Sequence, residues 1–523
     1  MSRLTGSYRH PREREYRAPG GPWDVPPLDT VLTEATALRS GDVLVDVPAV
    51  DGPDDVERAA TSGARLDAAG LEERVARLAG GLRAAGVRRH DVVAWQTPNW
   101  HEAVLLYRAC WRLGAIAAPI HNGHGAAEIE RSLAVLDPKV WLPREHIRGA
   151  ASDHFGELAD GVPLPASDNR GRPSDLAVVL FTSGATSEPK GVLHTQRGLA
   201  YKGRLMTGVH DLGVDDAVLM PAPLAHISGL LNGLLVPFCA SMKSVLMERW
   251  NPELGLELVD RERISFMIGP TTVFVALRDA PGFTPRRVES LRLISSGAGS
   301  VTPAFVRETA AALDCIVKRT YGSTEAPTVT TSRPGDPDDR VAETEGRSTG
   351  DAELRVVDLE TGRPVPAGEP GELLVRGPEL FAGYVDAAQT RAAVTRGWLR
   401  TGDIATVDAD GWLTIVGRIK DIIIRGGENI AATEVERVLE DHPLVQHAIA
   451  VGYPDDVFGE RVCAFVVTTE PFGLDDARAW FEARGVARFK TPERVVRLDA
   501  LPVLPVGKPD RNELRKLAAS DPV

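Results

Sequence analysis

The chain has 523 residues, of which 43% are apolar and 25% charged, so it has the composition of a globular protein with more than one domain. Its 60 Lys and Arg residues against 73 Asp and Glu residues give a net charge of −13, which argues against nucleic-acid binding. The four cysteines are far apart, without a CxxC pair, and no apolar stretch is long enough to span a membrane, so we expect an enzyme of the reducing cytoplasm.

The first 30 residues are rich in Arg, Pro and Gly and lack apolar periodicity, which predicts an irregular arm. Four apolar residues at helical spacing then predict a helix: Leu71, Val75, Leu78 and Leu82. A strand-like run at residues 92–95, a helix at 103–113 and a second strand at 115–119 follow. Because helix and short β run alternate in this way through the first 320 residues, we predict an α/β fold of stacked layers with substantially parallel sheets.

The pattern changes after Glu325, where short strands and turns predict a small β-rich subdomain at about residues 350–416. A small α+β domain follows, with two helices near 434–441 and 475–484 and two strands near 445–451 and 461–468. The predicted regions are an N-terminal arm (1–30), a large N-terminal domain (31–417) and a C-terminal domain (418–523).

A loop rich in hydroxyls and glycine follows the apolar run at residues 178–181 and ends at Lys190. Hydroxyls and backbone N–H groups donate hydrogen bonds to phosphate oxygens and a lysine adds charge, so this loop is a candidate polyphosphate site. The spacing is not that of a Walker A loop, because Gly184 lies six residues before Lys190 and Pro189 precedes the lysine. An ordinary solvated surface loop is the alternative interpretation.

Further motifs follow along the chain: Tyr321-Gly-Ser-Thr-Glu325, Thr401-Gly-Asp403, Gly417-Arg-Ile-Lys420, Gly426-Gly-Glu-Asn-Ile430 and Pro505-Val-Gly-Lys508. Their order, spacing and residue types, together with the phosphate loop, resemble the acyl-adenylate-forming superfamily, in particular its acyl-CoA synthetase branch. The resemblance covers about residues 70–515. It implies a two-step reaction in which an acid and ATP give acyl-AMP and pyrophosphate, and CoA then displaces AMP.

The resemblance also implies roles for single residues. Glu325 resembles the family's Mg²⁺ ligand, Thr324 the hydroxyl at the α-phosphate, Tyr321 the adenine-stacking ring, and Asp403 the ribose clamp assisted by Arg418. The full set of residues expected to bind ATP or AMP is Thr182, Ser183, Gly184, Ala185, Thr186, Lys190, Gly297, Ala298, Tyr321, Gly322, Thr324, Asp403, Arg418 and Lys508.

The C-terminal motifs imply a moving domain. Lys508 resembles the lysine that bridges the attacking carboxylate and the phosphate, and Lys420 the hinge about which the small domain rotates after adenylation. Gly426 and Gly427 resemble the wall of the pantetheine tunnel. The residues expected to be catalytic are Lys508, Lys190, Thr324, Glu325 and His226, the last of which matches the family's acyl-pocket motif.

Two positions depart from the family's pattern. Ser187 stands where the phosphate loop usually has glycine, which adds strain if the loop needs a positive φ there. Ser296-Gly-Ala-Gly-Ser300 stands where the family tends to end in Ala-Pro, which leaves the shape of the local pocket wall open.

We therefore predict an ATP-dependent carboxylic acid–CoA ligase that uses Mg²⁺ and belongs to fatty acid metabolism. Residues 224–236 are apolar apart from His226, Ser228 and Asn232, and residues 267–270 and 273–275 add apolar candidates. Since neither stretch offers a Lys, Arg, Asp or Glu, the expected substrate is a monocarboxylic acid with a medium-size apolar body, and a hydroxylated aromatic acid stays open.

Three alternatives remain at this point. An acyl-AMP ligase that loads a carrier protein is hard to distinguish by sequence. An amino-acid adenylation enzyme is disfavoured because no Asp or Glu lies between Ala217 and Met247 to pair with an ammonium group. A non-catalytic nucleotide-binding module is disfavoured because the charged motif residues are all present. The oligomeric state, a homodimer included, is left open.

Overall fold

The computed structural model describes residues 4–148, 152–182, 190–297, 301–426, 428–455, 457–503 and 509–520. The chain divides into two compact units. The large unit is Met1–Glu353 with Val375–Leu399, and the small unit is Leu354–Leu374 with Arg400–Val523. Each unit has its own hydrophobic core.

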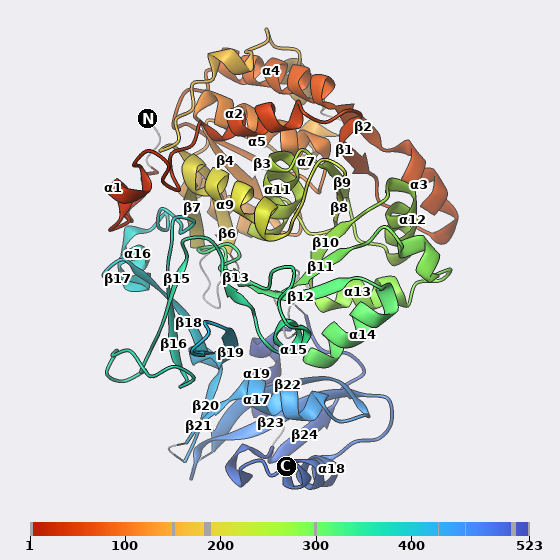
Figure 1. Cartoon of the computed structure of the whole chain (residues 1–523), viewed down its shortest axis with the longest axis vertical. Coiled ribbons are helices and arrows are strands. Elements are labelled where there is room, and N and C mark those ends of the chain that lie inside the picture. Colours follow the sequence, from red (N-terminus) through yellow and green to blue (C-terminus); the bar gives the residue numbers. More distant parts are fainter. Residues whose placement is uncertain are drawn as a thin grey trace. The chain divides into compact units, whose positions relative to one another are not determined.

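A nine-stranded sheet forms the largest layer of the large unit (Figure 1). Its strands, in spatial order, are β14 (Arg347–Ser348), β13 (Thr330–Thr331), β12 (Ile316–Tyr321), β11 (Leu293–Ser296), β10 (Phe266–Gly269), β8 (Ala217–Met220), β9 (Lys243–Met247), β1 (Asp42–Val47) and β2 (Ala64–Asp67). The run from β12 to β1 is parallel, and the strands at both ends are antiparallel.

A second sheet of the large unit has five strands: β5 (Val140–Leu142), β3 (Val92–Gln96), β4 (Ile116–Ile120), β6 (Leu176–Thr182) and β7 (Lys190–Thr195). Its first four strands are parallel, but β7 folds back antiparallel onto β6. The apolar run at residues 178–181 thus belongs to a strand, β6, whose hairpin partner β7 the sequence analysis did not foresee. Residues 183–189, which connect the two strands, lie outside the described residues.

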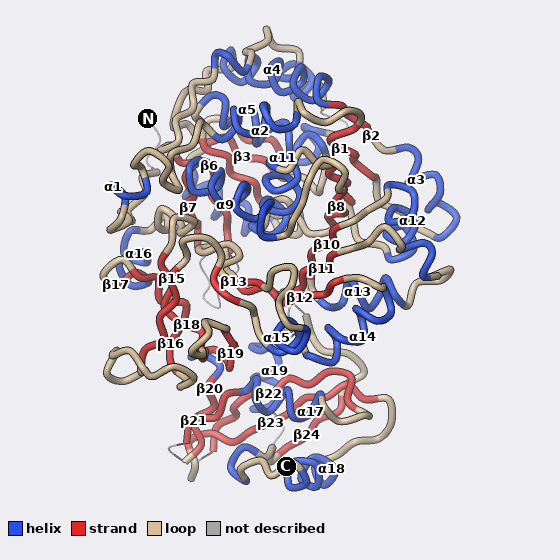
Figure 2. Tube along the Cα trace, in the orientation of Figure 1, coloured by secondary structure: helices blue, strands red, loops and turns tan. Residues whose placement is uncertain are grey.

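Helices lie between and outside these two sheets, as Figures 1 and 2 show. The helices of the large unit are α1 (Glu13–Tyr16), α2 (Leu28–Thr36), α3 (Val56–Ser62), α4 (Ala68–Ala84), α5 (His101–Leu113), α6 (Ala126–Leu136), α7 (Arg144–Ile147), α8 (Asp153–Ala159), α9 (Gln196–Val209), α10 (Ile227–Leu230), α11 (Val236–Cys239), α12 (Pro252–Glu262), α13 (Thr271–Arg278), α14 (Pro303–Leu313), α15 (Asp338–Glu343) and α16 (Ala387–Ala393). A π-helical turn, Leu231–Leu235, joins α10 to α11.

The alternation of buried residues along the strands explains the layers. In β3, Val93 and Trp95 pack into the core shared with the nine-stranded sheet, whereas Val92 and Ala94 pack on the opposite face with Leu136 of α6. Because both faces of each sheet are covered, central strands such as β3 and β4 are apolar along most of their length, as expected for parallel sheets. The predicted α/β class is confirmed.

The predicted helix–strand pairs near the N-terminus are also confirmed, as α4 followed by β3 and α5 followed by β4. Gly114 ends α5 in the left-handed conformation (φ 69°), which glycine adopts at no steric cost. Within the first 30 residues, Tyr16 and Trp23 pack against Tyr201 of α9. The N-terminal segment is therefore anchored on the large unit by buried aromatic side chains.

The remaining strands form two further sheets. One has the order β15 (Glu353–Val357), β16 (Gly371–Arg376), β18 (Trp398–Val407) and β17 (Val394–Thr395), with β19 (Leu413–Arg418) paired to β18. The other has the order β21 (Glu428–Ala431), β20 (Ile422–Arg425), β23 (Gly459–Thr468) and β22 (Val445–Asp455), with β24 (Arg494–Arg497) paired to β23.

The C-terminal sheet is covered on both faces by helices of the small unit, α17 (Ala432–Glu440), α18 (Leu474–Ala483) and α19 (Arg511–Ser520). Alternate residues of β23 face opposite sides: Val462 and Ala464 pack with α17 and α18, and Cys463 and Phe465 pack with α19. All four cysteines are free thiols. Within the described part of the chain, every helix is too short or too polar to serve as a membrane span.

Candidate active site

The two ends of the predicted phosphate loop are neighbours in the β6–β7 hairpin. Thr182, the last residue of β6, lies directly opposite Lys190, the first residue of β7. Both residues are half-buried. The Lys190 Nζ atom lies 5.6 Å from the centroid of the Tyr384 ring, within the range of a cation–π interaction. The hairpin therefore holds the lysine over an aromatic ring.

Tyr384 connects Lys190 to Glu325. Its hydroxyl donates a hydrogen bond of 2.6 Å to Glu325 Oε1. Burial, together with the neighbouring Glu325 carboxylate, raises the pKa of Tyr384 well above its ordinary value, so the hydroxyl stays protonated and remains a donor. The sequence analysis missed this residue, because its partner Glu325 lies 59 residues away and no local spacing links the two.

The main chain around Tyr384 extends the hairpin. Leu193 N–H donates to Gly383 O (3.0 Å) and Ala382 N–H to Leu193 O (2.7 Å), so this segment runs alongside the free edge of β7. Phe381 N–H also donates to Glu325 O (2.9 Å). Glu325 is thus held through its side chain and its carbonyl by the same short segment.

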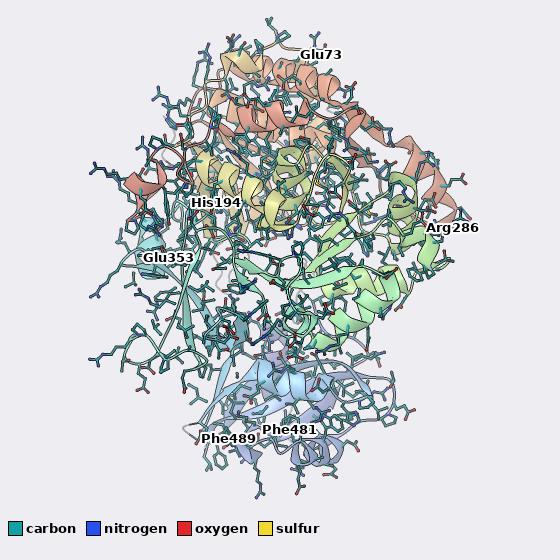
Figure 3. The ribbon with its side chains drawn as sticks, viewed as in Figure 1. Glu73, His194, Arg286, Glu353, Phe481 and Phe489 are labelled. Atoms are coloured by element: carbon teal, nitrogen blue, oxygen red, sulfur yellow. The ribbon has the colours of Figure 1, made fainter. Side chains whose placement is uncertain are left out.

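His194, labelled in Figure 3, supports the Thr324–Glu325 turn from β7. Its Nε2–H donates a 2.7 Å hydrogen bond to the main-chain oxygen of Thr324. Burial lowers the pKa of His194 to about 4, so the ring is neutral near pH 7. The sequence analysis missed His194, because its partner lies 130 residues away and no local spacing links them.

Glycine is required at two predicted nucleotide-binding positions. A Cβ atom on Gly297 would lie 2.6 Å from the Thr320 carbonyl oxygen, and one on Gly322 would lie 2.4 Å from the Thr328 nitrogen. Both glycines follow the carboxyl ends of parallel strands, β11 and β12. Tyr321, the last residue of β12, is half-buried at the same edge. A ligand in this fold binds at that edge of the sheet.

The predicted acyl-side histidine, His226, lies at the N-terminus of α10, in the loop that follows β8. Asn99 anchors this loop: its Nδ2 donates to Ala222 O (2.8 Å) and Met220 O (3.3 Å), and its Oδ1 accepts from Leu224 N–H (2.8 Å). The loop is therefore fixed before it reaches the histidine.

A second histidine packs on His226. The ring of His121, which follows β4, has its centroid 4.8 Å from that of His226. Gly123 N–H donates to His121 Nδ1 (3.0 Å), so the proton of the neutral ring is on Nε2. Burial lowers the pKa of His121 below its ordinary value. The sequence analysis did not single out this residue.

Most apolar residues predicted to line an acyl pocket pack instead into the core. Leu230, Leu231, Leu234 and Leu235 belong to the core between the two large sheets, and Phe274 belongs to the core on the far face of the nine-stranded sheet. An apolar run next to a parallel sheet is needed to cover that sheet, and the lining of an acyl pocket by these residues stays a prediction. The half-buried residues of the segment are His226, Ile227 and Ser228.

Four of the predicted site residues that the structure describes lie in the small unit. Asp403 on β18 stands directly opposite Arg418 on β19, and Arg418 Nε donates to Asp403 Oδ1 (2.5 Å). Lys420 follows in a 3₁₀ turn, Ile419–Asp421, and burial lowers its pKa below the ordinary value. The structure thus brings the predicted ribose clamp and its arginine together. Gly426, at the turn between β20 and β21, has a φ of +59°.

Several predicted positions lie outside the described residues: Ser183, Gly184, Ala185, Thr186, Ser187, Ala298, Gly427 and Lys508.

The donor set at Glu325 fits Mg²⁺, which prefers one or two carboxylates completed by phosphate oxygens. Another group of potential metal ligands, Asp46, His101 and Glu102, has ligand atoms within 4.8 Å of one another. There, however, Arg148 donates one hydrogen bond to Asp46 and two, of 2.6 and 2.8 Å, to Glu102. A guanidinium already supplies the positive charge in that cluster, so it is an ion-pair network.

Comparison with known proteins agrees with this geometry. The chain matches the family described as AMP-binding enzyme over residues 46–385 and the AMP-binding enzyme C-terminal domain over residues 434–508. It is 32% identical to a medium-chain fatty-acid–CoA ligase of Escherichia coli over 498 residues, covering 89% of this chain and 88% of that protein. It is 35% identical to a feruloyl-CoA synthase of Amycolatopsis over 473 residues, covering 87% and 94% of the two chains.

Solved structures are similar over most of the chain. The ATP-bound crystal structure of MatB from Rhodopseudomonas palustris superposes with a TM-score of 0.83 at 25% identity, covering 94% of this chain and 99% of that chain. The amide bond synthetase McbA from Marinactinospora thermotolerans gives a TM-score of 0.83 at 26% identity, with coverage of 94% and 100%. These matches show that the chain belongs to the AMP-binding, adenylate-forming enzyme family.

Proposed function

We propose that this chain is an ATP-dependent carboxylic acid–CoA ligase. In the first step, the carboxylate of the acid attacks the α-phosphorus of ATP, forming the acyl–phosphate bond of acyl-AMP and releasing pyrophosphate. In the second step, the thiol of CoA attacks the acyl carbonyl, the acyl–phosphate bond breaks, and AMP leaves. The observation that carries the proposal is the chain of contacts Lys190–Tyr384–Glu325 at the base of the predicted phosphate loop.

Lys190 and Glu325, the two charged residues of this chain of contacts, would both act in the formation of acyl-AMP. Two anions, the carboxylate and the triphosphate, must approach each other, so positive charge is needed at the phosphates. Lys190 would supply part of it, and Glu325, oriented by Tyr384, would hold Mg²⁺, which neutralises developing charge on the phosphate oxygens when bound. Asp403 would accept hydrogen bonds from the ribose hydroxyls, with Arg418 holding its carboxylate in place.

The acid we propose is a monocarboxylic acid with a medium-size apolar body. No Asp or Glu lies between Ala217 and Met247, and the half-buried residues around His226 are Ile227 and Ser228. A second charge on the substrate would be unpaired there, which is unfavourable. The names of two relatives, a medium-chain fatty-acid–CoA ligase and a feruloyl-CoA synthase, fall in the same class of acids.

A carrier protein is the second candidate acyl acceptor. Both acceptors present the same phosphopantetheine thiol, so the first step is common to them. CoA and a phosphopantetheinylated carrier protein, offered separately at matched thiol concentration, distinguish the two.

The activity is tested with a panel of acids: acetate, hexanoate, decanoate, cyclohexanecarboxylate, benzoate, succinate and phenylalanine. We expect acid-dependent pyrophosphate exchange, and CoA-dependent AMP release with the highest kcat/KM on hexanoate, decanoate, cyclohexanecarboxylate or benzoate. A preference for acetate, succinate or phenylalanine would contradict the proposed acid class. Exchange without CoA-dependent turnover would contradict CoA as the acceptor.

We further propose that the chain beyond residue 417 rotates between the two steps, with Lys420 as the hinge and Lys508 acting only in adenylation. Lys508→Ala should lower pyrophosphate exchange by about 10²-fold or more while still converting supplied acyl-AMP and CoA to thioester. Lys420→Pro should do the reverse, because proline fixes φ and restricts the preceding residue. Lys516→Ala, an exposed lysine of α19, is the matched control and should change neither step.

A further inference from the structure

A small cavity lies at the amino ends of β11 and β12, at the opposite edge of the sheet from Gly297 and Tyr321. Leu293 and Ile316, the first residues of the two strands, form part of its wall. Its volume is about 30 Å³, whereas about 10–15 Å³ is enough for one water molecule. The cavity therefore has room for a small occupant and none for a nucleotide, a phosphate ester or an acyl chain.

Three polar side chains that line this cavity have bonding capacity left over. Lys318 is 2% exposed, and its Nζ donates one hydrogen bond, to Ser332 O (2.8 Å), of the three it can make. Ser332 and His210 are each 1% exposed. Within the described residues, Ser332 Oγ and both ring nitrogens of His210 lack a hydrogen-bond partner. Since a buried polar group without a partner is costly, a polar occupant would satisfy them together.

The charge around the cavity favours an anion over water. Arg292 and Arg333 line it beside Lys318, and no Asp or Glu belongs to its lining. Asp336 is the acid that most favours the charged form of Lys318. Its two carboxylate oxygens, however, already accept hydrogen bonds from the Arg333 main-chain N–H (2.7 Å) and the Arg347 side chain (2.6 Å). Arg292 is neutralised by Asp216. Lys318 is left as a buried ammonium that forms no ion pair within the described residues.

The protonation of the two basic groups is consistent with this arrangement. Burial, with Arg292 adding to the effect, lowers the pKa of Lys318 to about 7. Burial also holds the pKa of His210 well below its usual value, so the imidazole is neutral and has one N–H to donate. A bound anion would restore the pKa of Lys318 toward its ordinary value, whereas a water molecule would not.

We propose that this cavity is a binding site for a monatomic anion of the size of chloride, held by the Lys318 ammonium, the Ser332 hydroxyl and a His210 N–H. The anion would stabilise the amino ends of β11 and β12. The volume of about 30 Å³ suits a monatomic anion better than sulfate or phosphate, each of which has five non-hydrogen atoms. The cavity is separate from the proposed catalytic site, so anion binding can be tested whether or not the chain has the proposed ligase activity.

The first test compares thermal unfolding of the full chain in sodium chloride, sodium bromide and sodium gluconate at equal ionic strength. A ligand that binds the folded state alone raises Tm, so we expect chloride and bromide to raise it by roughly 2–5 °C over gluconate. Lys318→Met, which keeps the length of the side chain but loses the charge, should abolish the difference. Lys139→Met, at an exposed lysine of the same unit, should keep it.

The second test locates the occupant directly in crystals of the wild-type chain grown with bromide. An anomalous peak beside Lys318 is expected. Ser332→Ala, which removes one donor and keeps the charge, should weaken the halide response without removing it, and serves if Lys318→Met does not fold. Equal Tm in chloride and gluconate, or a cavity that holds an ordered water only, would overturn the proposal.

Discussion

The two ends of the parallel strands in the nine-stranded sheet satisfy their polar groups differently. At the carboxyl ends, Gly297 and Gly322 exclude side chains and Tyr321 remains half-buried. At the amino ends, Asp216 before β8 accepts from Ser265 before β10 (2.6 Å) and from Arg292 before β11 (2.7 and 2.8 Å). The carboxyl end is shaped by glycines that admit no side chain, and the amino end contains a hydrogen-bonded ion pair that ties three strands together.

Substitutions at the two ends of the strands should therefore have different effects, on activity at the carboxyl ends and on stability at the amino ends. Ligands in α/β sheets bind outside the carboxyl ends of the strands. We therefore expect substitutions at that end to change turnover with little effect on unfolding, and substitutions at the amino end to do the opposite.

The largest effect is expected from Glu325→Gln at the carboxyl end. Glutamine keeps an oxygen that accepts from Tyr384 but loses the charge that would hold Mg²⁺. Pyrophosphate exchange should fall about 10²–10³-fold, the scale for loss of one electrostatic group in a catalytic site. Tm should change by less than about 2 °C. A variant with normal exchange would remove Glu325 from the metal site.

At the amino end, Asp216→Ala should lower the free energy of unfolding by about 2–3 kcal/mol. It leaves Ser265 and Arg292 without their shared acceptor, and part of the loss is offset because the Arg292 side chain is 42% exposed. Urea unfolding measures the loss, and kcat per folded molecule should not change. Asp215→Ala, at an exposed neighbour, is the control. A fall in kcat for Asp216→Ala would erase the distinction between the two ends.

Tyr384→Phe should have a smaller effect on turnover than Glu325→Gln. It removes the hydroxyl that orients the Glu325 carboxylate, and a hydrogen bond to a charged group is worth about 1.5 kcal/mol or more, so exchange should fall about tenfold. Tyr201→Phe, on α9, is the control, because it removes a comparable hydrogen bond from a tyrosine hydroxyl to the Asp351 carboxylate (3.1 Å). Tyr201→Phe should lower Tm and leave pyrophosphate exchange unchanged. If both variants lost the same fraction of exchange activity, the loss in Tyr384→Phe would come from packing in general.

The smallest effect concerns acid pH. Burial acts to raise the pKa of Asp216, but hydrogen bonds from Arg292 and Ser265 outweigh it and hold the pKa below the ordinary value. Its contribution to stability is therefore complete above the unfolded-state pKa of about 3.9 and is lost as pH falls through the folded-state value. The Tm difference between wild type and Asp216→Asn should shrink from neutral pH to pH about 3. A difference independent of pH would contradict the role of the charge.

The layered α/β fold could be predicted because its signals are local. Four apolar residues at helical spacing predict α4: Leu71, Val75, Leu78 and Leu82. Gly114 marks the end of α5. Each of these signals lies within a single element. The contact between Asp403 and Arg418 agrees with the resemblance to the family, which implies that Arg418 assists Asp403.

What could not be predicted depends on contacts between distant segments. Tyr384 and His194 reach Glu325 and Thr324 across 59 and 130 residues, and neither has a local pattern that reveals its partner. The apolar run around Leu231 was interpreted as pocket wall because burial in a core and contact with a substrate select the same residue types. Periodicity alone cannot separate these two uses.

The segment from Phe381 to Val385, which lies along the free edge of β7, has a consequence for biosynthesis. An exposed edge strand is a template for pairing with another chain, and during synthesis β7 emerges from the ribosome about 190 residues before the segment that covers it. The large unit therefore cannot cover the free edge of its five-stranded sheet cotranslationally until more than two thirds of the chain has been made. Nascent chains arrested before that point should be the species most dependent on chaperones.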